Sequence, residues 1–114
     1  MYGDTNSTLA GTVAAVKLHI PVAHVEAGLR SYNRAMPEEI NCVLSDHASD
    51  VLFAPTQAAF RHLRSEGIPE SRIEMTGDVM YDAALYYGAL SHTRSNILEK
   101  LELEKGAFIL STLH

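Results

Sequence analysis

Short β-prone runs alternate with helix-compatible stretches along the chain, and this alternation restricts the fold more than any other feature of the sequence. The β-prone runs are residues 21–26, 51–54, 72–76 and 107–111. The helix-compatible stretches are residues 8–18, 37–47, 56–66, 81–90 and 95–103. Strands that alternate with helices form βαβ units with right-handed crossovers, and their strands lie in one parallel sheet. We therefore predict an α/β fold, in which ligands bind at the carboxyl ends of the strands.

Local residue chemistry predicts where several helices begin and end. Pro37 suits a first helical turn, and the two acids after it suit the positive end of the helix dipole. Thr56 is a candidate N-cap, and Gly67 is a candidate stop. The positions predicted to face inward are Leu9, Ala10, Val13, Ala14 and Leu18 in the first helix, Ile40, Val43, Leu44 and His47 in the second, and Ala59, Phe60 and Leu63 in the third. From residue 78 the pattern becomes mainly helical, so we predict one domain over residues 1–77 and a crossing into a second over residues 78–114.

Composition and charge argue against several classes of function. Apolar residues make up 46% of the chain and charged residues 20%, which is typical of a globular protein. The net charge of -5 does not favour binding to nucleic acid or to an anionic membrane. No apolar run approaches the roughly 20 residues that cross a bilayer, and no signal peptide is evident. Cys42 is the only cysteine, so no internal disulfide can form and a cytoplasmic location is predicted.

Both ends of the sequence predict a fragment of a longer chain. Only two residues precede the turn-like segment that begins at Gly3, and a single residue follows the strand-like stretch of residues 108–113, which contains the last β-prone run. We therefore expect strands to precede and to follow these residues in a parent protein.

Three segments contain acids at positions that suit a ligand site. Asp4 lies in Gly-Asp-Thr-Asn-Ser-Thr (residues 3–8), between a strand end and a helix start, where backbone N–H groups can hold a phosphate. The segment lacks the lysine and glycine spacing of a P-loop. A purely structural reading is open as well, because aspartate, serine and threonine are common helix caps.

The second segment is His-Val-Glu-Ala-Gly-Leu-Arg, residues 24–30, at the end of a predicted strand. Strand alternation predicts that His24 and Glu26 point to the same side. Gly28 permits a sharp turn, and Arg30 follows in the loop. Glu26 and Arg30 are candidates for an active site, and a structural ion pair between them is the alternative.

The third segment begins at Pro37, and His114 ends the chain. Glu38 and Glu39 lie about 100° apart on a helix, so at most one is expected to face a shared pocket. Their alternative role is to interact with the helix dipole in water. His114 is a candidate acid or phosphate contact, and a surface histidine without a role is the alternative. The lone cysteine and the scattered histidines do not predict a metal site.

Taken together and in order, these segments resemble the non-hydrolysing UDP-N-acetylglucosamine 2-epimerases. The resemblance rests on residues 3–5, 24–30, 37–41, 53–56, 76–79 and 112–114 and covers essentially the whole chain. It implies two Rossmann-like domains that face each other across a cleft, as in the GT-B fold. Residues 1–77 would be the later part of the N-terminal domain, and residues 78–114 the crossing and the start of the C-terminal domain.

The resemblance also implies a reaction and a set of site residues. The family interconverts UDP-N-acetylglucosamine and UDP-N-acetylmannosamine by eliminating UDP, forming 2-acetamidoglucal and adding UDP back. The resemblance implies that no cofactor is required and that the full-length parent is a homodimer. Asp4, Glu26 and Glu38 match the family's catalytic carboxylates, His114 matches its diphosphate-contacting histidine, and Asp4, Glu26, Arg30 and His114 are the implied substrate-binding residues. Cys42 departs from the pattern, since the family often has arginine there.

Two further interpretations stay open at this stage. A hydrolysing epimerase, which releases UDP and free N-acetylmannosamine, shares the fold and several of the acids. A non-catalytic flavodoxin-like domain is the other, because each acid also has a structural explanation. As a fragment, the chain alone is expected to be inactive.

Overall fold

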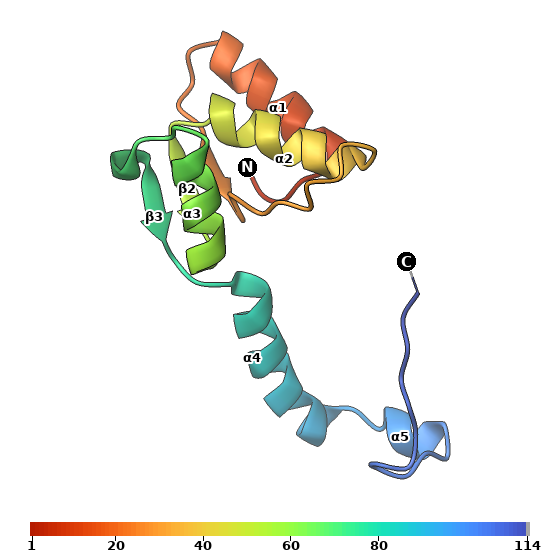
Figure 1. The fold of residues 1–114 in the computed structure, drawn as a ribbon. Helices are drawn as coiled ribbons and strands as arrows, with labels where there is room; N and C mark the ends of the chain where they lie inside the picture. Colours follow the sequence, from red (N-terminus) through yellow and green to blue (C-terminus); the bar gives the residue numbers. More distant parts are fainter. Residues whose placement is uncertain (114) are drawn as a thin grey trace. The chain divides into compact units, whose positions relative to one another are not determined.

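The computed structural model describes residues 1–113, and the chain divides into two compact units, Met1–Val79 and Met80–His114 (Figure 1). The first unit contains a parallel sheet of three strands, β1 (Ala23–Val25), β2 (Val51–Ala54) and β3 (Ile73–Met75), in the order β1-β2-β3. The three strands predicted in this part of the chain are thus confirmed. The division of the chain into parts of two larger domains stays a prediction.

Three helices alternate with these strands: α1 (Asn6–Lys17), α2 (Pro37–Ala48) and α3 (Gln57–Ser65). The side chain of Thr56 accepts a hydrogen bond from the backbone N–H of Ala59 at 3.1 Å, so the predicted N-cap is confirmed. Pro37 occupies the first turn of α2, as predicted. A 3-10 helix, Glu70–Arg72, leads into β3.

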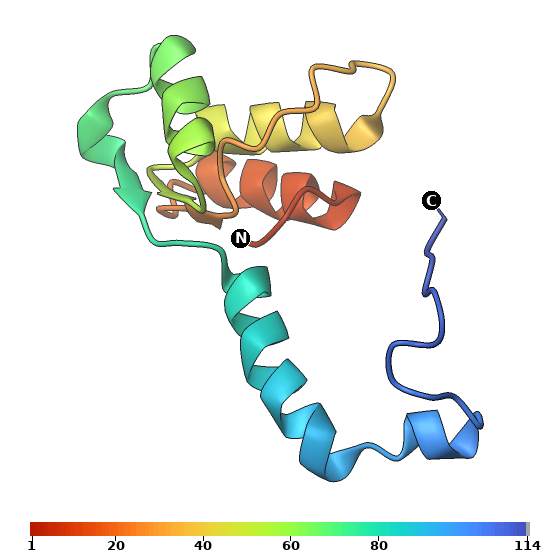
Figure 2. The same ribbon diagram turned by 60° about the horizontal axis from the view of Figure 1, so that its bottom comes forward.

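The helices that connect the strands lie on one face of the sheet (Figures 1 and 2). His24, Leu52 and Ile73 are aligned across the three strands and therefore point to the same side. His24 contacts Asp46 of α2, and the other two pack against α3. Strands in sequential order with right-handed crossovers produce this one-sided arrangement. α1 packs beside α2 in the same layer.

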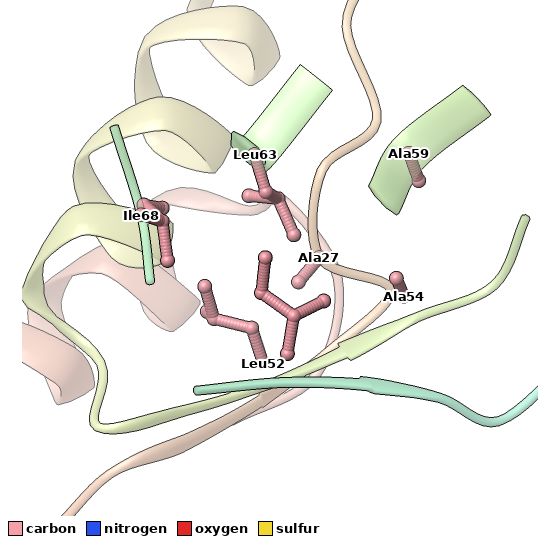
Figure 3. Close-up of a cluster of buried hydrophobic side chains, with 7 residues drawn as sticks. Ala27, Leu52, Ala54, Ala59, Leu63 and Ile68 are labelled. Carbon is pink, nitrogen blue, oxygen red and sulfur yellow. The ribbon is translucent and has the colours of Figure 1, made fainter. Parts of the chain in front are cut away.

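The apolar core lies between the sheet and α3 (Figure 3). Its buried members are Ala27, Leu52, Ala54, Ala59, Leu63, Ile68 and Ile73. Phe60 packs against them while remaining partly exposed. The inward face predicted for this helix is therefore confirmed.

The inward faces predicted for the first two helices are wrong. In α1 the buried residues are Thr8 and Thr12, whereas Val13 and Leu18 are exposed. In α2 the buried residues are Glu39, Asn41, Cys42, Ser45 and Asp46. Polar side chains can face inward here because each helix meets polar partners rather than the apolar core.

The second unit contains two helices, α4 (Val79–Arg94) and α5 (Ile97–Lys100). The strand predicted at residues 107–111 is wrong, since these residues have no strand structure. A strand requires a hydrogen-bonded neighbour, and the described part of this unit contains no other strand. No helix within the described residues is both long and apolar enough to span a membrane.

Candidate functional site

Two of the candidate acids lie at the carboxyl edge of the sheet because they follow neighbouring parallel segments. Tyr2 forms a parallel bridge with Val25, so Asp4 leaves one segment just where Glu26 leaves the other. The phenol of Tyr2 donates a hydrogen bond to Oε1 of Glu26 at 3.0 Å. The Gly3 N–H donates to the carbonyl of Val25 at 3.2 Å. Segments that are remote in sequence therefore meet at the edge where parallel sheets bind ligands.

Glu26 has a left-handed backbone, with φ of 68°. This conformation is unfavourable for a residue with a Cβ atom, and at functional sites it costs roughly 1–3 kcal/mol. The strand ends at Val25, so the alternation that predicted a shared side for His24 and Glu26 stops before Glu26. His24 is fully buried, whereas Glu26 remains partly exposed at the edge.

The start of α2 brings a third acid to the same edge. The Asn41 side chain donates from Nδ2 to the Asp4 carbonyl and to Asn6 Oδ1, both at 2.9 Å. Asp4 and Glu38 are both exposed and line one open pocket of about 280 Å³, together with Ser31 and Cys42. The pocket thus presents two carboxylates to solvent, one from each segment.

Glu39 has a different environment from its neighbour Glu38. Its Oε2 accepts hydrogen bonds from the N–H and the hydroxyl of Ser31, at 2.7 and 2.8 Å. Burial acts to raise the pKa of Glu39, but the hydrogen bonds from Ser31 outweigh it and hold that pKa below its usual value. Glu39 therefore holds the loop after Arg30 in place as a carboxylate, and Glu38 is the acid of this pair that stays exposed.

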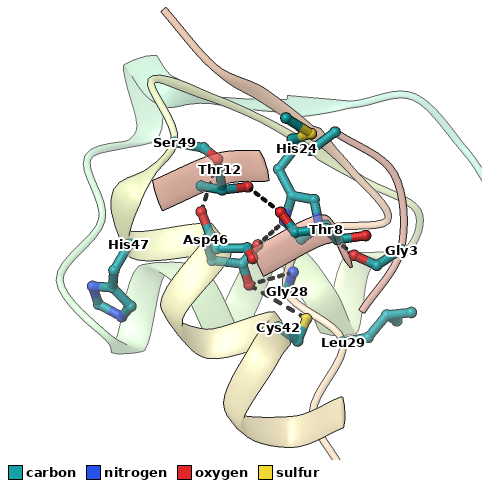
Figure 4. A network of polar contacts seen from close by, with 12 residues as sticks. Gly3, Thr8, Thr12, His24, Gly28, Leu29, Cys42, Asp46, His47 and Ser49 are labelled. Atoms are coloured by element: carbon teal, nitrogen blue, oxygen red, sulfur yellow. Dashed lines mark hydrogen bonds and ion pairs between the residues drawn. The ribbon is translucent and has the colours of Figure 1, made fainter. Parts of the chain in front are cut away.

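Asp46 is the centre of a buried polar network beneath this edge (Figure 4). One carboxylate oxygen lies 2.7 Å from Nδ1 of His24, and the other accepts from the Gly28 N–H at 3.0 Å and lies 2.8 Å from Nη1 of Arg30. The other ring nitrogen of His24, Nε2, lies 2.8 Å from the Gly3 carbonyl oxygen. The Asp46 carboxylate thereby connects the end of β1 with the glycine turn and the loop that come after this strand.

His24 has an acceptor next to each ring nitrogen, because a carbonyl oxygen and an ionised carboxylate can only accept. Both nitrogens donate at once only in the imidazolium form. Burial acts to lower the pKa of His24, but the hydrogen bonds to Asp46 and to the Gly3 carbonyl outweigh it, so that this pKa is raised. Both contacts therefore favour the protonated form of His24, paired with Asp46.

Arg30 is held by two acids, and neither of them is Glu26. Its Nε and Nη2 donate to the two carboxylate oxygens of Glu66 at 2.7 and 2.8 Å, and Nη1 contacts Asp46. The side chain is only 1% exposed. Burial opposes its charge, but these partners raise the pKa of Arg30 further above its usual value. Arg30 therefore pairs with Glu66 and Asp46, and the alternative of an ion pair with Glu26 is wrong. Contact of Arg30 with the substrate stays a prediction.

Cys42 is the residue that departs from the pattern implied by the sequence resemblance. Its Sγ atom lies 3.4 Å from Nη1 of Arg30 and 3.7 Å from an Asp46 oxygen. Burial and the nearby Asp46 carboxylate raise the pKa of Cys42 to about 12. The residue is therefore a neutral thiol at the base of the pocket.

His114 lies outside the described residues, so its predicted role stays a prediction. Among residues 1–113, no group of three or more His, Cys, Asp or Glu side chains is arranged to hold a metal ion.

Asp46 and Glu66, which support the site from below, were not predicted from the sequence, and Glu39 was named there without its hydrogen bonds to Ser31. One signal was present in α2: Cys42 and Asp46 are four residues apart and share a helix face with Asn41, Ser45 and Ser49. Polar residues that line one face of a helix indicate buried hydrogen bonds when the opposite face of that helix also carries apolar residues. Glu66 left no such signal, because its partner Arg30 is 36 residues away.

Comparison with known proteins places this geometry in a family. The family model described as UDP-N-acetylglucosamine 2-epimerase matches residues 1–114. The chain belongs to the UDP-N-acetylglucosamine 2-epimerase family. The predicted family is thereby confirmed, and the predicted α/β fold with its parallel sheet agrees with the structures of the epimerases.

Several epimerases show how similar the chain is. A UDP-N-acetylglucosamine 2-epimerase homolog from Methanococcus maripaludis is 53% identical over 100% of this chain and 32% of its own length. A UDP-2,3-diacetamido-2,3-dideoxy-D-glucuronate 2-epimerase from Pseudomonas aeruginosa is 49% identical over 100% of the chain and 31% of its length. The crystal structure of the Methanocaldococcus jannaschii UDP-GlcNAc 2-epimerase with UDP-GlcNAc and UDP matches with a TM-score of 0.83 and 50% identity, over 89% of this chain and 28% of that one. The chain thus spans about a third of these epimerases.

Proposed function

We propose that the full-length protein containing this chain inverts C2 of UDP-N-acetylglucosamine to give UDP-N-acetylmannosamine. The observation that carries the proposal is that the segments of Asp4, Glu26 and Glu38 meet at the carboxyl edge of the sheet, where Asp4 and Glu38 line one pocket, in a member of the epimerase family. The solved structure of a 50% identical epimerase in complex with UDP-GlcNAc and UDP supports the choice of substrate. We further propose a cytoplasmic homodimer for the full-length protein.

The chemistry requires groups that these acids can supply. A carboxylate takes the C2 proton, while the C1–O bond breaks and UDP leaves with the bonding electrons, so that 2-acetamidoglucal forms. Delivery of a proton to the opposite face of C2 and return of UDP to C1 complete the inversion. Proton transfer by a positioned side chain contributes about 10²–10⁴-fold to a rate. In this proposal Asp4, Glu26 and Glu38 carry the proton transfers, and His114 stabilises the departing diphosphate.

The test is an assay of the full-length protein with UDP-N-acetylglucosamine in D₂O, followed by NMR of the products. We expect UDP-N-acetylmannosamine with deuterium at C2, and a loss of at least about 100-fold in kcat for Asp4→Asn, Glu26→Gln and Glu38→Gln. Glu70→Gln is the matched control. Glu70 is exposed and lies just before the amino end of β3, whereas the candidate acids lie at the carboxyl edge of the sheet. Full activity in all three variants would contradict the proposal. Accumulation of free UDP and N-acetylmannosamine would indicate the hydrolysing reaction instead.

A second substrate is favoured by the Pseudomonas aeruginosa relative, which is named for UDP-2,3-diacetamido-2,3-dideoxy-D-glucuronate and is 49% identical. Inversion at C2 is common to both sugars, so the same acids would serve. The assay should therefore offer each sugar separately, and the larger kcat/KM identifies the substrate.

A further inference from the structure

Three consecutive backbone carbonyl groups around Asp4 form hydrogen bonds with side chains from other parts of the first unit. The Tyr2 carbonyl accepts from the Thr8 hydroxyl at 2.8 Å. The Gly3 carbonyl lies 2.8 Å from Nε2 of His24, and the Asp4 carbonyl accepts from Asn41 Nδ2 at 2.9 Å. The peptides on both sides of the Asp4 Cα atom are thereby fixed in direction.

The groups that hold these peptides are buried, whereas the Asp4 side chain is exposed. His24 has no accessible surface, and that of Asn41 is 6% of its maximum. His24 is itself fixed by Asp46, at 2.7 Å from its other ring nitrogen, with both side chains fully buried. The backbone that carries the exposed Asp4 side chain is therefore fixed from the interior of the unit.

We infer that His24, held by Asp46, is a positioning residue that fixes the Gly3–Asp4 peptide and so aims the Asp4 carboxylate at the sugar, with Asn41 holding the following peptide in the same way. This inference rests on the proposed function for its kinetic consequences. A displacement of about 1 Å in a reacting group can cost about 100-fold in rate, so loss of the His24 contact lowers kcat. The KM for the UDP-sugar stays the same, because His24 is buried and does not line the pocket.

Two substitutions separate the two contacts of His24. In His24→Gln the side-chain nitrogen reaches the position of Nε2, so the bond to the Gly3 carbonyl is kept and the bond to Asp46 is lost. In His24→Asn the nitrogen reaches only the position of Nδ1, so the bond to Asp46 is kept and the Gly3 contact is lost. Both variants remove the ring and its charge, which makes them controls for each other.

The experiment measures kcat, KM and Tm for both variants in the full-length protein. We expect about a 100-fold loss of kcat in His24→Asn, at unchanged KM, and less than about a tenfold loss in His24→Gln. Combined with Asp4→Asn, the His24→Asn substitution should cost nothing further, because it acts through Asp4. Losses of kcat that follow the change in Tm in both variants, or that are independent of Asp4, would overturn the inference.

Two additional measurements decide the cases that kinetics leaves open. If the His24 variants do not fold, Asn41→Asp removes the donor to the Asp4 carbonyl and should lower kcat only while Asp4 is present; an additive loss would overturn the inference. If the wild-type protein epimerises neither UDP-sugar, the proposed function has failed, and the Asp4 backbone amide resonance becomes the readout. A shift of this resonance in His24→Asn but not in His24→Gln supports the inference, and equal spectra overturn it.

Discussion

Cys42 lies at the base of the pocket, in contact with a buried cation and a buried carboxylate. A positively charged side chain at this position would lie beside Arg30, whose guanidinium is already 2.8 Å from Asp46. A neutral thiol avoids this repulsion and packs against both groups. Cys42 therefore adds no charge to the pocket lined by Asp4 and Glu38.

We predict that Cys42 resists alkylation in the native protein. Only the thiolate is a nucleophile, and a pKa of about 12 leaves about one thiol in 10⁴ ionised at pH 8. Burial of the residue, which is 4% exposed, adds a steric barrier. Iodoacetamide treatment followed by peptide mapping should label Cys42 in guanidinium chloride and leave it unlabelled without denaturant. Rapid labelling of the native protein at pH 8 would contradict this prediction.

Glu26 gives a second prediction at the same scale, because its left-handed backbone is kept at a cost. Glycine accepts a φ of 68° without a Cβ clash, whereas alanine does not. The Glu26→Gly variant should therefore be more stable than Glu26→Ala by about 1 kcal/mol, seen as a higher Tm in calorimetry of the full-length protein. Both variants lose the proposed activity equally, since both lack the carboxylate. A less stable glycine variant would show that this backbone is not strained.

At the scale of elements, the sequence predicts best what depends on neighbouring residues. The Thr56 cap, the start of α2 at Pro37 and strand β2 at residues 51–54 each follow from chemistry within a few positions. The inward faces of α1 and α2 could not be predicted, because Thr12, Ser45 and Asp46 are buried for reasons that lie elsewhere in the chain. Asp46 is buried because His24, Gly28 and Arg30 neutralise or hydrogen-bond its carboxylate, and these partners lie 16 to 22 residues away.

In the candidate site, too, the features that depend on neighbouring residues were predictable and those that depend on distant residues were not. Asp4, Glu26 and Glu38 were predicted from their places after strands or at a helix start, and the structure brings their segments to one edge. The conformation of Glu26 and the network beneath it were not predictable, since both depend on which segments meet in space.

The turn between β1 and α2 yields a prediction that compares two glycines. Gly28 and Gly67 both have positive φ, at 79° and 87°. A Cβ atom at Gly28 would lie 2.5 Å from the Ala59 carbonyl oxygen, whereas one at Gly67 would meet nothing within 4 Å. Gly67→Ala should cost only the conformational penalty of about 1 kcal/mol. Gly28→Ala should cost at least about 1–3 kcal/mol more, because the backbone of α3 must move. Equal losses of Tm in the two variants would refute this account.

At the scale of the whole molecule, one face of the sheet carries apolar side chains. Among the described residues of the first unit, no helix covers this face. Val25, Val51 and Phe53 point away from the face that α2 and α3 cover, and Val51 is 37% exposed. The chain covers 32% of the Methanococcus maripaludis relative and 28% of the Methanocaldococcus jannaschii epimerase, so we expect further segments of the full-length protein to cover this face. This is why the fold class follows from these residues, while the proposed activity concerns the full-length protein.

The stability of the molecule should depend on pH through Glu66, which unites α3 with the loop after β1. Hydrogen bonds from Arg30, reinforced by His47, lower the pKa of Glu66 despite partial burial. A lowered native pKa gives stability that is complete above the unfolded value near 4.5 and is lost as pH falls through the native pKa. Calorimetry of the full-length protein between pH 3 and 7 should therefore show a Tm that falls below about pH 4.5, with a smaller fall in Glu66→Gln. Glu70→Gln, in which the acid is exposed and 3.9 Å from Arg64, should keep the wild-type dependence. An unchanged acid dependence in Glu66→Gln would mean that the Arg30 pair contributes nothing to the pH dependence of folding.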